Sequence, residues 1–278
     1  MQHVVKLNLA RNCLKYIIRV YGIKEIFIPY YTCPIVWESL REEKCKIKFY
    51  HINEQFMPEI NFHKDDYILY INYFGLCSNN CKILSKKYKN LILDNSQAFY
   101  ADNVGLASFS SLRKFFNVPN GAYLYINNLL HEDFIEDKFQ NIPVLIHKNY
   151  KKFLQNELVI NNEKNIKYIN PNIENKMKNI DFEKDKKQRI KIFNQYAEIF
   201  DKKNNLQFTA NKYNIPYCYP FSPKNKDFAQ SFIENNLVLL WLWNPIPKNF
   251  IEHNFLNNTI ALPLNDTKYA NKIINIYS

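Results

Sequence analysis

The chain has 278 residues and a mass of 33.4 kDa, enough for one large domain or two unequal ones. Its 47% hydrophobic and 23% charged residues are typical of a globular protein, and six cysteines are too few for a disulfide scaffold. The net charge of +11 would suit a nucleic acid, an acidic membrane or small anions, but the lysines are mixed with Asn, Glu and Asp and no nucleic-acid-binding motif accompanies them, so we expect a solvated polar surface.

Local sequence excludes further classes. The apolar run 237–243 is too short to cross a bilayer, and the N-terminus lacks the apolar stretch of a secretory signal, so we expect a cytoplasmic protein. Cys77 and Cys81 form a C-x3-C pair without a second pair or a nearby histidine, so we expect no metal site. Only four glycines occur, which rules out a glycine-rich dinucleotide or P-loop motif.

The first half of the chain alternates between the two kinds of periodicity. A helix is predicted over 10–21, because Cys13, Leu14, Ile17, Ile18 and Tyr21 fall on one face and Gly22 follows as a stop. Further helices are predicted at 34–43 and 81–88, and strands at 25–28, 46–51, 67–73, 90–93, 107–109 and 122–126. This alternation predicts an α/β fold with a mainly parallel sheet wrapped by helices. Ligands gather at the carboxyl ends of such strands, here 29–32, 73–75 and 94–97.

The second half has a different character. Residues 147–185 are rich in Asn, Lys and Glu, and we expect an irregular connection with helical pieces. A helix returns at 185–203, and 206–278 resembles a small α+β unit. The expected organisation is a large domain over 1–146, followed by a connection and a small C-terminal domain over 147–278.

Two residues form a candidate reactive pair. Asp94 ends a predicted buried strand, where a carboxylate is costly without a cationic partner. Lys114 follows 20 residues later beside two phenylalanines, and burial there would lower the pKa of its amine, as a nucleophile requires. A lysine and an acid are the main protein groups that a pyridoxal phosphate (PLP) enzyme needs. The residues alone leave open that Asp94 is a helix cap and that Lys114 and Arg113 are a surface pair.

The order of segments resembles the DegT/DnrJ/EryC1/StrS family of sugar aminotransferases, which have the fold type I architecture of PLP-transferases. Segments similar to the family's stand in family order over nearly the whole chain: LARNCL at 9–14, IPYYTC at 28–33, INYFG at 71–75, DNSQA at 94–98, SLRK at 111–114, PNGA at 119–122, WLWNPIP at 241–247 and IALPL at 260–264.

The resemblance implies a role for each matching residue. Lys114 would hold PLP covalently, Asp94 would meet its pyridine nitrogen and Gln97 would lie near the cofactor. The phosphate would be bound at the start of the first helix and by a hydroxyl from the lysine segment, through Arg11, Asn12, and Ser110 or Ser111. Tyr31 would stack on the ring, although strict alignment puts Cys33 there. Leu9 and Ala10 replace the family's serine and glycine.

The resemblance also implies a reaction, a homodimer and a pathway. We expect transfer of an amino group from an amino acid, with glutamate as the expected donor, to a keto-sugar, nucleotide-linked, for surface-glycan synthesis. Nucleic acid is not an expected partner. The alternatives are a PLP enzyme with a non-sugar substrate, a dehydratase, or a catalytically inactive member that acts as a binding module. Arg11 is equally well a helix-surface charge, and the histidines are expected to be structural or exposed.

Overall fold

A seven-stranded sheet forms the larger part of the molecule. The computed structural model describes residues 2–138, 143 and 145–278. The strand order is β1-β7-β6-β5-β4-β2-β3. The five strands β2 to β6 run parallel to one another, whereas β7 runs antiparallel to both β6 and β1. The strands are β1 (His3–Leu7), β2 (Glu25–Pro29), β3 (Lys46–Tyr50), β4 (Ile68–Ile71), β5 (Leu91–Asp94), β6 (Ala107–Ser111) and β7 (Ala122–Ile126). The predicted mainly parallel α/β sheet is confirmed.

Helices cover both faces of this sheet. α1 (Ala10–Tyr21) contacts β6, β7 and α2 (Pro34–Glu42), while α3 (Ser78–Lys87) packs on β5. α1 has the predicted bounds because its apolar residues face the sheet and Gly22 ends it in the left-handed conformation, with φ +58°. The two faces carry separate apolar clusters, and α1 and α3 belong to different ones. The helices thereby fix the sheet from both sides.

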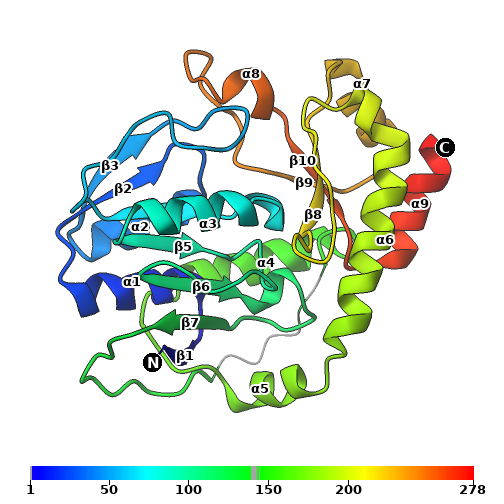
Figure 1. Cartoon of the computed structure of the whole chain (residues 1–278). Coiled ribbons are helices and arrows are strands. Elements are labelled where there is room, and N and C mark those ends of the chain that lie inside the picture. Colours follow the sequence, from blue (N-terminus) through cyan, green and yellow to red (C-terminus); the bar gives the residue numbers. More distant parts are fainter. Residues whose placement is uncertain (1, 139–142, 144) are drawn as a thin grey trace.

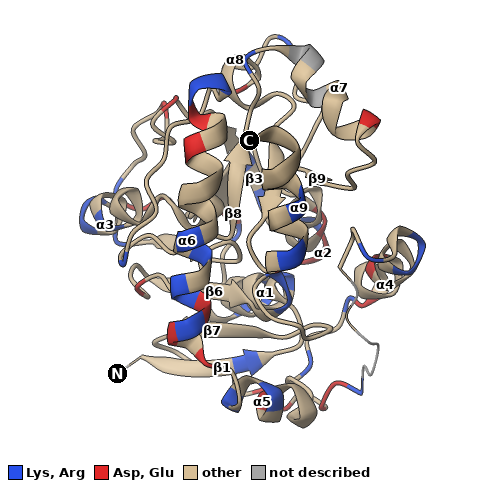
Figure 2. Ribbon diagram, turned by 90° about the vertical axis from the view of Figure 1, so that its right-hand side faces the viewer, with Lys and Arg blue, Asp and Glu red and all other residues tan. Residues whose placement is uncertain are grey.

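The region predicted to be an irregular connection is largely helical. It contains α4 (Tyr150–Asn162), α5 (Pro171–Lys178) and the first residues of α6 (Phe182–Phe200). α6 starts three residues before the predicted 185 because Asp181 caps it, accepting the N–H of Lys184 at 2.9 Å. Lys and Arg alternate with Asp and Glu along α6 (Figure 2), as expected for a solvated helix face.

A small antiparallel sheet forms a second unit beside the first (Figure 1). Its order is β8-β10-β9, and α6 and α9 pack against it and against each other. Its elements are β8 (Cys218–Phe221), α7 (Lys226–Glu234), β9 (Leu240–Trp241), α8 (His253–Leu256), β10 (Ile260–Pro263) and α9 (Thr267–Tyr277). One apolar cluster joins residues of β4 and β5 to α6, β8 and β10, so the two sheets share a core.

Two local predictions were wrong. No strand was expected at the N-terminus, yet β1 pairs with β7 along its whole length. The strand expected over 67–73 stops at Ile71, and Tyr73–Gly75 forms a 3-10 turn in which Phe74 has φ +58° and Gly75 has φ +75°. A Cβ on Gly75 would lie 2.7 Å from the carbonyl oxygen of Gln97, so this turn needs glycine. Within the described parts of the chain, no helix combines the length and apolarity needed to cross a membrane.

Candidate active site

A cavity of about 350 Å³ lies where the large sheet, α4 and the small sheet meet. Its volume is within the range of small-molecule sites. Gln97 and Lys114 come from the carboxyl ends of β5 and β6, and Phe153 and Glu157 from α4. Apolar residues of the small unit complete the wall: Leu239, Leu240, Trp241, Leu242, Trp243, Ala261 and Pro263. The sheet edge that the sequence indicated thus borders a mainly apolar cavity whose lining includes the Lys114 amine.

Lys114 is positioned by the short 3-10 turn Leu112–Lys114 that follows β6 directly. Desolvation is the main cause that lowers the pKa of its ammonium; the Asp94 carboxylate raises that pKa and the Arg113 guanidinium lowers it. A lowered pKa increases the fraction of neutral amine near pH 7, which is the nucleophilic form. The predicted pairing with Asp94 is therefore electrostatic in this structure, and Lys114 faces the cavity.

Asp94 and Gln97 are held by backbone groups. Asp94 is buried, and its Oδ1 accepts the N–H of Ser96 at 2.8 Å, so it also caps the turn after β5. The Oε1 of Gln97 accepts the N–H of Phe74 at 2.8 Å, and the side chain lines the cavity. These bonds fix both side chains at the strand end. Preorganised groups of this kind are what a cofactor site requires.

Arg189 of α6 holds the segment that carries Lys114. Its side chain is fully buried; Nη2 donates to the carbonyl of Phe115 at 2.8 Å and Nη1 to that of Tyr217 at 3.3 Å. Its Nε donates to Asp185 at 2.7 Å, which neutralises the charge. Phe115 follows Lys114 directly, so Arg189 connects α6, the lysine turn and the cavity wall. Nothing in the local sequence distinguished this arginine from the others.

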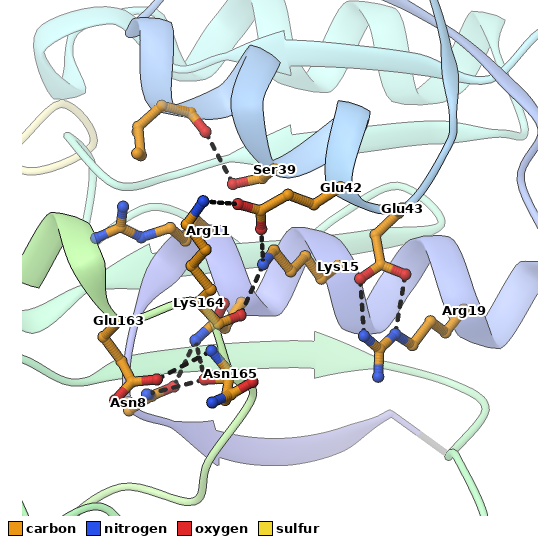
Figure 3. Close-up of polar contacts among 12 residues, drawn as sticks. Asn8, Arg11, Lys15, Arg19, Ser39, Glu42, Glu43, Glu163, Lys164 and Asn165 are labelled. Atoms are coloured by element: carbon orange, nitrogen blue, oxygen red, sulfur yellow. Dashed lines mark hydrogen bonds and ion pairs between the residues drawn. The ribbon is translucent and has the colours of Figure 1, made fainter.

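The start of α1 is covered by residues 160–167, which we call the strap (Figure 3). Arg11 donates Nη2 to the carbonyl of Ile160 at 2.7 Å. Asn12 is fully buried and donates Nδ2 to the carbonyl of Asn165 at 2.6 Å, while its N–H is bonded to the carbonyl of Leu9 at 3.0 Å. Neither residue lines the cavity. Both side chains thus contact the strap in this structure, and the phosphate-binding roles expected for Arg11 and Asn12 stay a prediction.

Two lysines anchor the strap further along α1. Lys15 is buried, pairs with Glu42 of α2 and donates to the carbonyl of Lys164 at 2.7 Å. The ammonium of Lys164 returns to Glu42 at 3.1 Å. One turn beyond Lys15, the exposed Arg19 forms a two-pronged pair with Glu43 at 2.8 and 2.9 Å (Figure 3). Arg19 does not contact the strap in these bonds.

Tyr31, Ser110 and Ser111 are, like Asp94, not among the residues that line the cavity. Tyr31 is buried in the core, where its hydroxyl donates to the carbonyl of Leu242 at 3.3 Å and its ring stacks on Tyr73. Ser110 and Ser111 are buried in β6, paired with β7, and do not line the cavity. Cys33 does line it, which agrees with the strict alignment for the residue beside the ring.

Two polar pairs at the cavity were not foreseen. Arg113 binds Glu157 of α4 with both terminal nitrogens, at 2.5 and 3.1 Å. His147 lines the cavity, donates or accepts through Nε2 at 3.0 Å with Asp266 and stacks on Tyr269 at 3.9 Å between ring centres. The partners lie 44 and 119 residues apart, so no sequence spacing indicated them. Among the residues that the structure describes, no group of three His, Cys, Asp or Glu could hold a metal.

Comparison with solved structures gives the same fold. An aminotransferase of the DegT DnrJ EryC1 StrS type from Brucella abortus matches with a TM-score of 0.63 and 13% identity, over 99% of this chain and 85% of that one. A putative sugar aminotransferase from Streptococcus pneumoniae in its PMP form gives 0.66 and 12%, over 99% and 85%. Helicobacter pylori PseC, an aminotransferase involved in the biosynthesis of pseudoaminic acid, gives 0.60 and 16%, over 98% and 85%.

No protein-family model and no curated protein matches the sequence. At these identities the likeness establishes the fold, so the expected fold type I architecture is confirmed. The chemistry has to be argued from the residues around the cavity.

Proposed function

We propose that this protein is a PLP-dependent aminotransferase that uses Lys114 to hold the cofactor and acts on a keto-sugar. The carrying observation is a lysine of lowered pKa that faces a cavity at the carboxyl edge of the sheet, with a buried carboxylate in electrostatic reach. The similar structures include sugar aminotransferases in PLP and PMP forms, which supports both the cofactor and the substrate class.

The donor groups present fit this cofactor. Asp94 would provide the carboxylate that keeps a pyridine nitrogen protonated, and Gln97 lines the cavity. Arg113, which lines the cavity, and Arg11, which lies close enough to feel its charge, would be the cations available to a phosphate. When bound, PLP supplies an electron sink for the proton loss at the substrate carbon.

The chain's own residues then perform the remaining steps. Nζ of Lys114 reacts as a neutral amine, and once released it accepts a proton from the donor carbon and returns it. The Arg189 bond to the Phe115 carbonyl holds the backbone segment that carries Lys114. Phe153, Trp241 and Trp243 contribute apolar side chains to the lining of the cavity. Glutamate as donor, a nucleotide-linked sugar, a role in surface-glycan synthesis and a cytoplasmic location remain part of this proposal.

A homodimer is also part of the proposal. The outer side of α4 carries Tyr150, Leu154 and Leu158 at four-residue spacing, with 54%, 42% and 64% of their surfaces exposed. An apolar stripe beside the cavity is suited to cover by a second copy of the chain. The molar mass in solution, by sedimentation, checks this expectation.

The decisive test is a visible absorption spectrum after addition of PLP to the wild type, Lys114→Ala and the exposed-site control Lys86→Ala. We expect a borohydride-trapped adduct in the wild type and the control that is absent from Lys114→Ala, and peptide mass spectrometry should locate it at residue 114. No cavity-specific adduct in any variant would reject the enzyme proposal. The inactive binding module would then be favoured, because Leu9 provides no side-chain cap at the start of α1 and the strap covers that turn.

A further inference from the structure

Cations and carboxylates gather around Lys114. Desolvation, and after it the Arg113 guanidinium, lower the pKa of both Arg11 and Lys114, so Arg113 repels both groups. Four carboxylates act on these cations: Asp94 at the end of β5, the exposed Glu38 on α2, Glu157 on α4, and Glu163 directly after α4. Of these four, Glu157 forms hydrogen bonds with one of the three cations, namely Arg113. The Glu157 side chain is thus an internal anion in direct contact with Arg113.

We propose that Arg11 and Arg113 form a binding site for a phosphate group, and that Glu157 occupies this site until a phosphate displaces it. The inference rests on the proposed function, because it assigns a ligand and a control to the same cavity. α4 is then held against the cavity by the bonds between Glu157 and Arg113, and we call this contact the latch. Binding of a phosphate to Arg113 would break these bonds and release α4.

The two contacts that a phosphate would replace are both on α4. Glu157 binds Arg113 in a two-pronged arrangement, which is also the arrangement in which guanidinium groups bind phosphate oxygens. Arg11 spends Nη2 on the backbone carbonyl of Ile160, a neutral acceptor three residues further along the same helix. A phosphate carries more charge and more acceptor oxygens than one carboxylate and one carbonyl. It therefore satisfies both arginines better than α4 does.

The latch is accessible to a ligand in the cavity. Arg113 and Glu157 line the cavity, and their side chains keep 27% and 25% of their surface exposed. Arg11 does not itself line the cavity, but it binds the carbonyl of Ile160, which does, and it lies at the first turn of α1, where no side chain caps the helix. Exchange of one anion for another on Arg113 needs no movement of the buried sheet edge, because Gln97 is held by the backbone of Phe74.

The phosphate has two possible sources, the cofactor and a phosphorylated substrate. Three probes separate them: PLP, its phosphate-free analogue pyridoxal, and inorganic pyrophosphate. The variant Glu157→Gln removes the internal anion while keeping the side-chain shape. Glu174→Gln makes the same change of charge on α5, where Glu174 pairs with Lys6 and Tyr123, away from both arginines. Circular dichroism checks that each variant is folded.

We expect Glu157→Gln to bind phosphate-bearing probes about tenfold more tightly than the wild type, a typical strength for coupling between two ligands of one site. Glu174→Gln should behave as the wild type does. If PLP tightens and pyridoxal does not, the cofactor phosphate is the ligand. If PLP is unchanged and pyrophosphate tightens on the loaded protein, the substrate phosphate is the ligand. In Arg113→Gln/Glu157→Gln the gain should disappear.

The same experiment has outcomes that overturn the inference. Equal tightening of PLP and pyridoxal would mean that loosening of α4 alone improves access. No change for any probe would mean that Glu157 does not compete with phosphate. Pyrophosphate binding by calorimetry does not depend on an adduct at Lys114, so it separates failure of the latch from failure of the aminotransferase proposal. As a second measurement on the wild type, pyrophosphate should speed amide exchange across residues 150–162.

Discussion

The two walls of the cavity are built in different ways. On the sheet side, Gln97 and Lys114 follow buried strands and are fixed by backbone bonds and by the buried Arg189. On the other side, α4 and the strap are held by side chains of α1 and by Arg113 of the lysine turn, and the Arg113–Glu157 pair is partly exposed. Buried, fully bonded groups are costly to disturb, whereas partly exposed ion pairs exchange readily. We therefore expect that α4 and the strap can be disturbed without disturbing the position of Lys114.

The largest expected effect comes from breaking the rigid wall at Arg189. In Arg189→Met, the carbonyls of Phe115 and Tyr217 lose a donor and Asp185 loses its cation. We expect a loss of about 3–5 kcal/mol in the free energy of unfolding, as for one partner removed from a buried pair. Urea unfolding measures it. The exposed Arg19→Met should cost only about 0.5 kcal/mol; equal losses for the two variants would remove the distinction between the walls.

The sequence predicted the sheet side of the cavity better than it predicted α4 and the strap. Periodicity placed α1 and most strands, because the apolar residues that make those patterns pack on one sheet within the first half of the chain. It missed β1, a short edge strand whose partner β7 is more than a hundred residues away. Motif order placed Asp94, Gln97 and Lys114, since each sits at a strand end.

The contacts of α4 and the strap could not be predicted from the sequence, for a physical reason. α4 faces the cavity with Phe153 and Ile160 but leaves other apolar residues outside, so no single apolar face marks it as a packed helix. α1 reaches this region through single hydrogen bonds, from Arg11 to the carbonyl of Ile160 and from Lys15 to that of Lys164, each across 149 residues of sequence. Such bonds depend on tertiary placement, and residue types such as Asn and Lys carry little information about it.

Lys15 tests whether α4 and the strap are held separately from the sheet. In Lys15→Met the buried ammonium that joins Glu42 to the Lys164 carbonyl is lost, while Glu42 keeps its bond to Lys164. We expect a loss of about 1–2 kcal/mol in stability. Amide exchange read by mass spectrometry should accelerate over 150–167 and stay unchanged in β4, β5 and β6. Uniform acceleration across the sheet would show that strap and sheet unfold together.

The smallest expected effect concerns Asp266 of the small unit, which contacts His147 and Lys148 in the segment before α4. Desolvation raises the pKa of this carboxyl, but hydrogen bonds from His147, the Tyr269 N–H and Lys148 outweigh it and hold the pKa at about 2. Because the folded pKa lies below the unfolded value of about 3.8, the stabilisation is present above that value and is lost as pH falls toward 2.

Asp266→Asn isolates this contribution, since asparagine still caps the start of α9. The wild type should exceed the variant in unfolding free energy by about 0.5–1 kcal/mol near pH 6. The difference should shrink as the pH is lowered through about 3. A constant difference across that range would mean that the carboxylate charge does not hold His147. The segment that leads into α4 would then be fixed by the stacking of His147 on Tyr269. α4 would thus depend on packing at its N-terminal end and on the Arg113–Glu157 ion pair further along the helix.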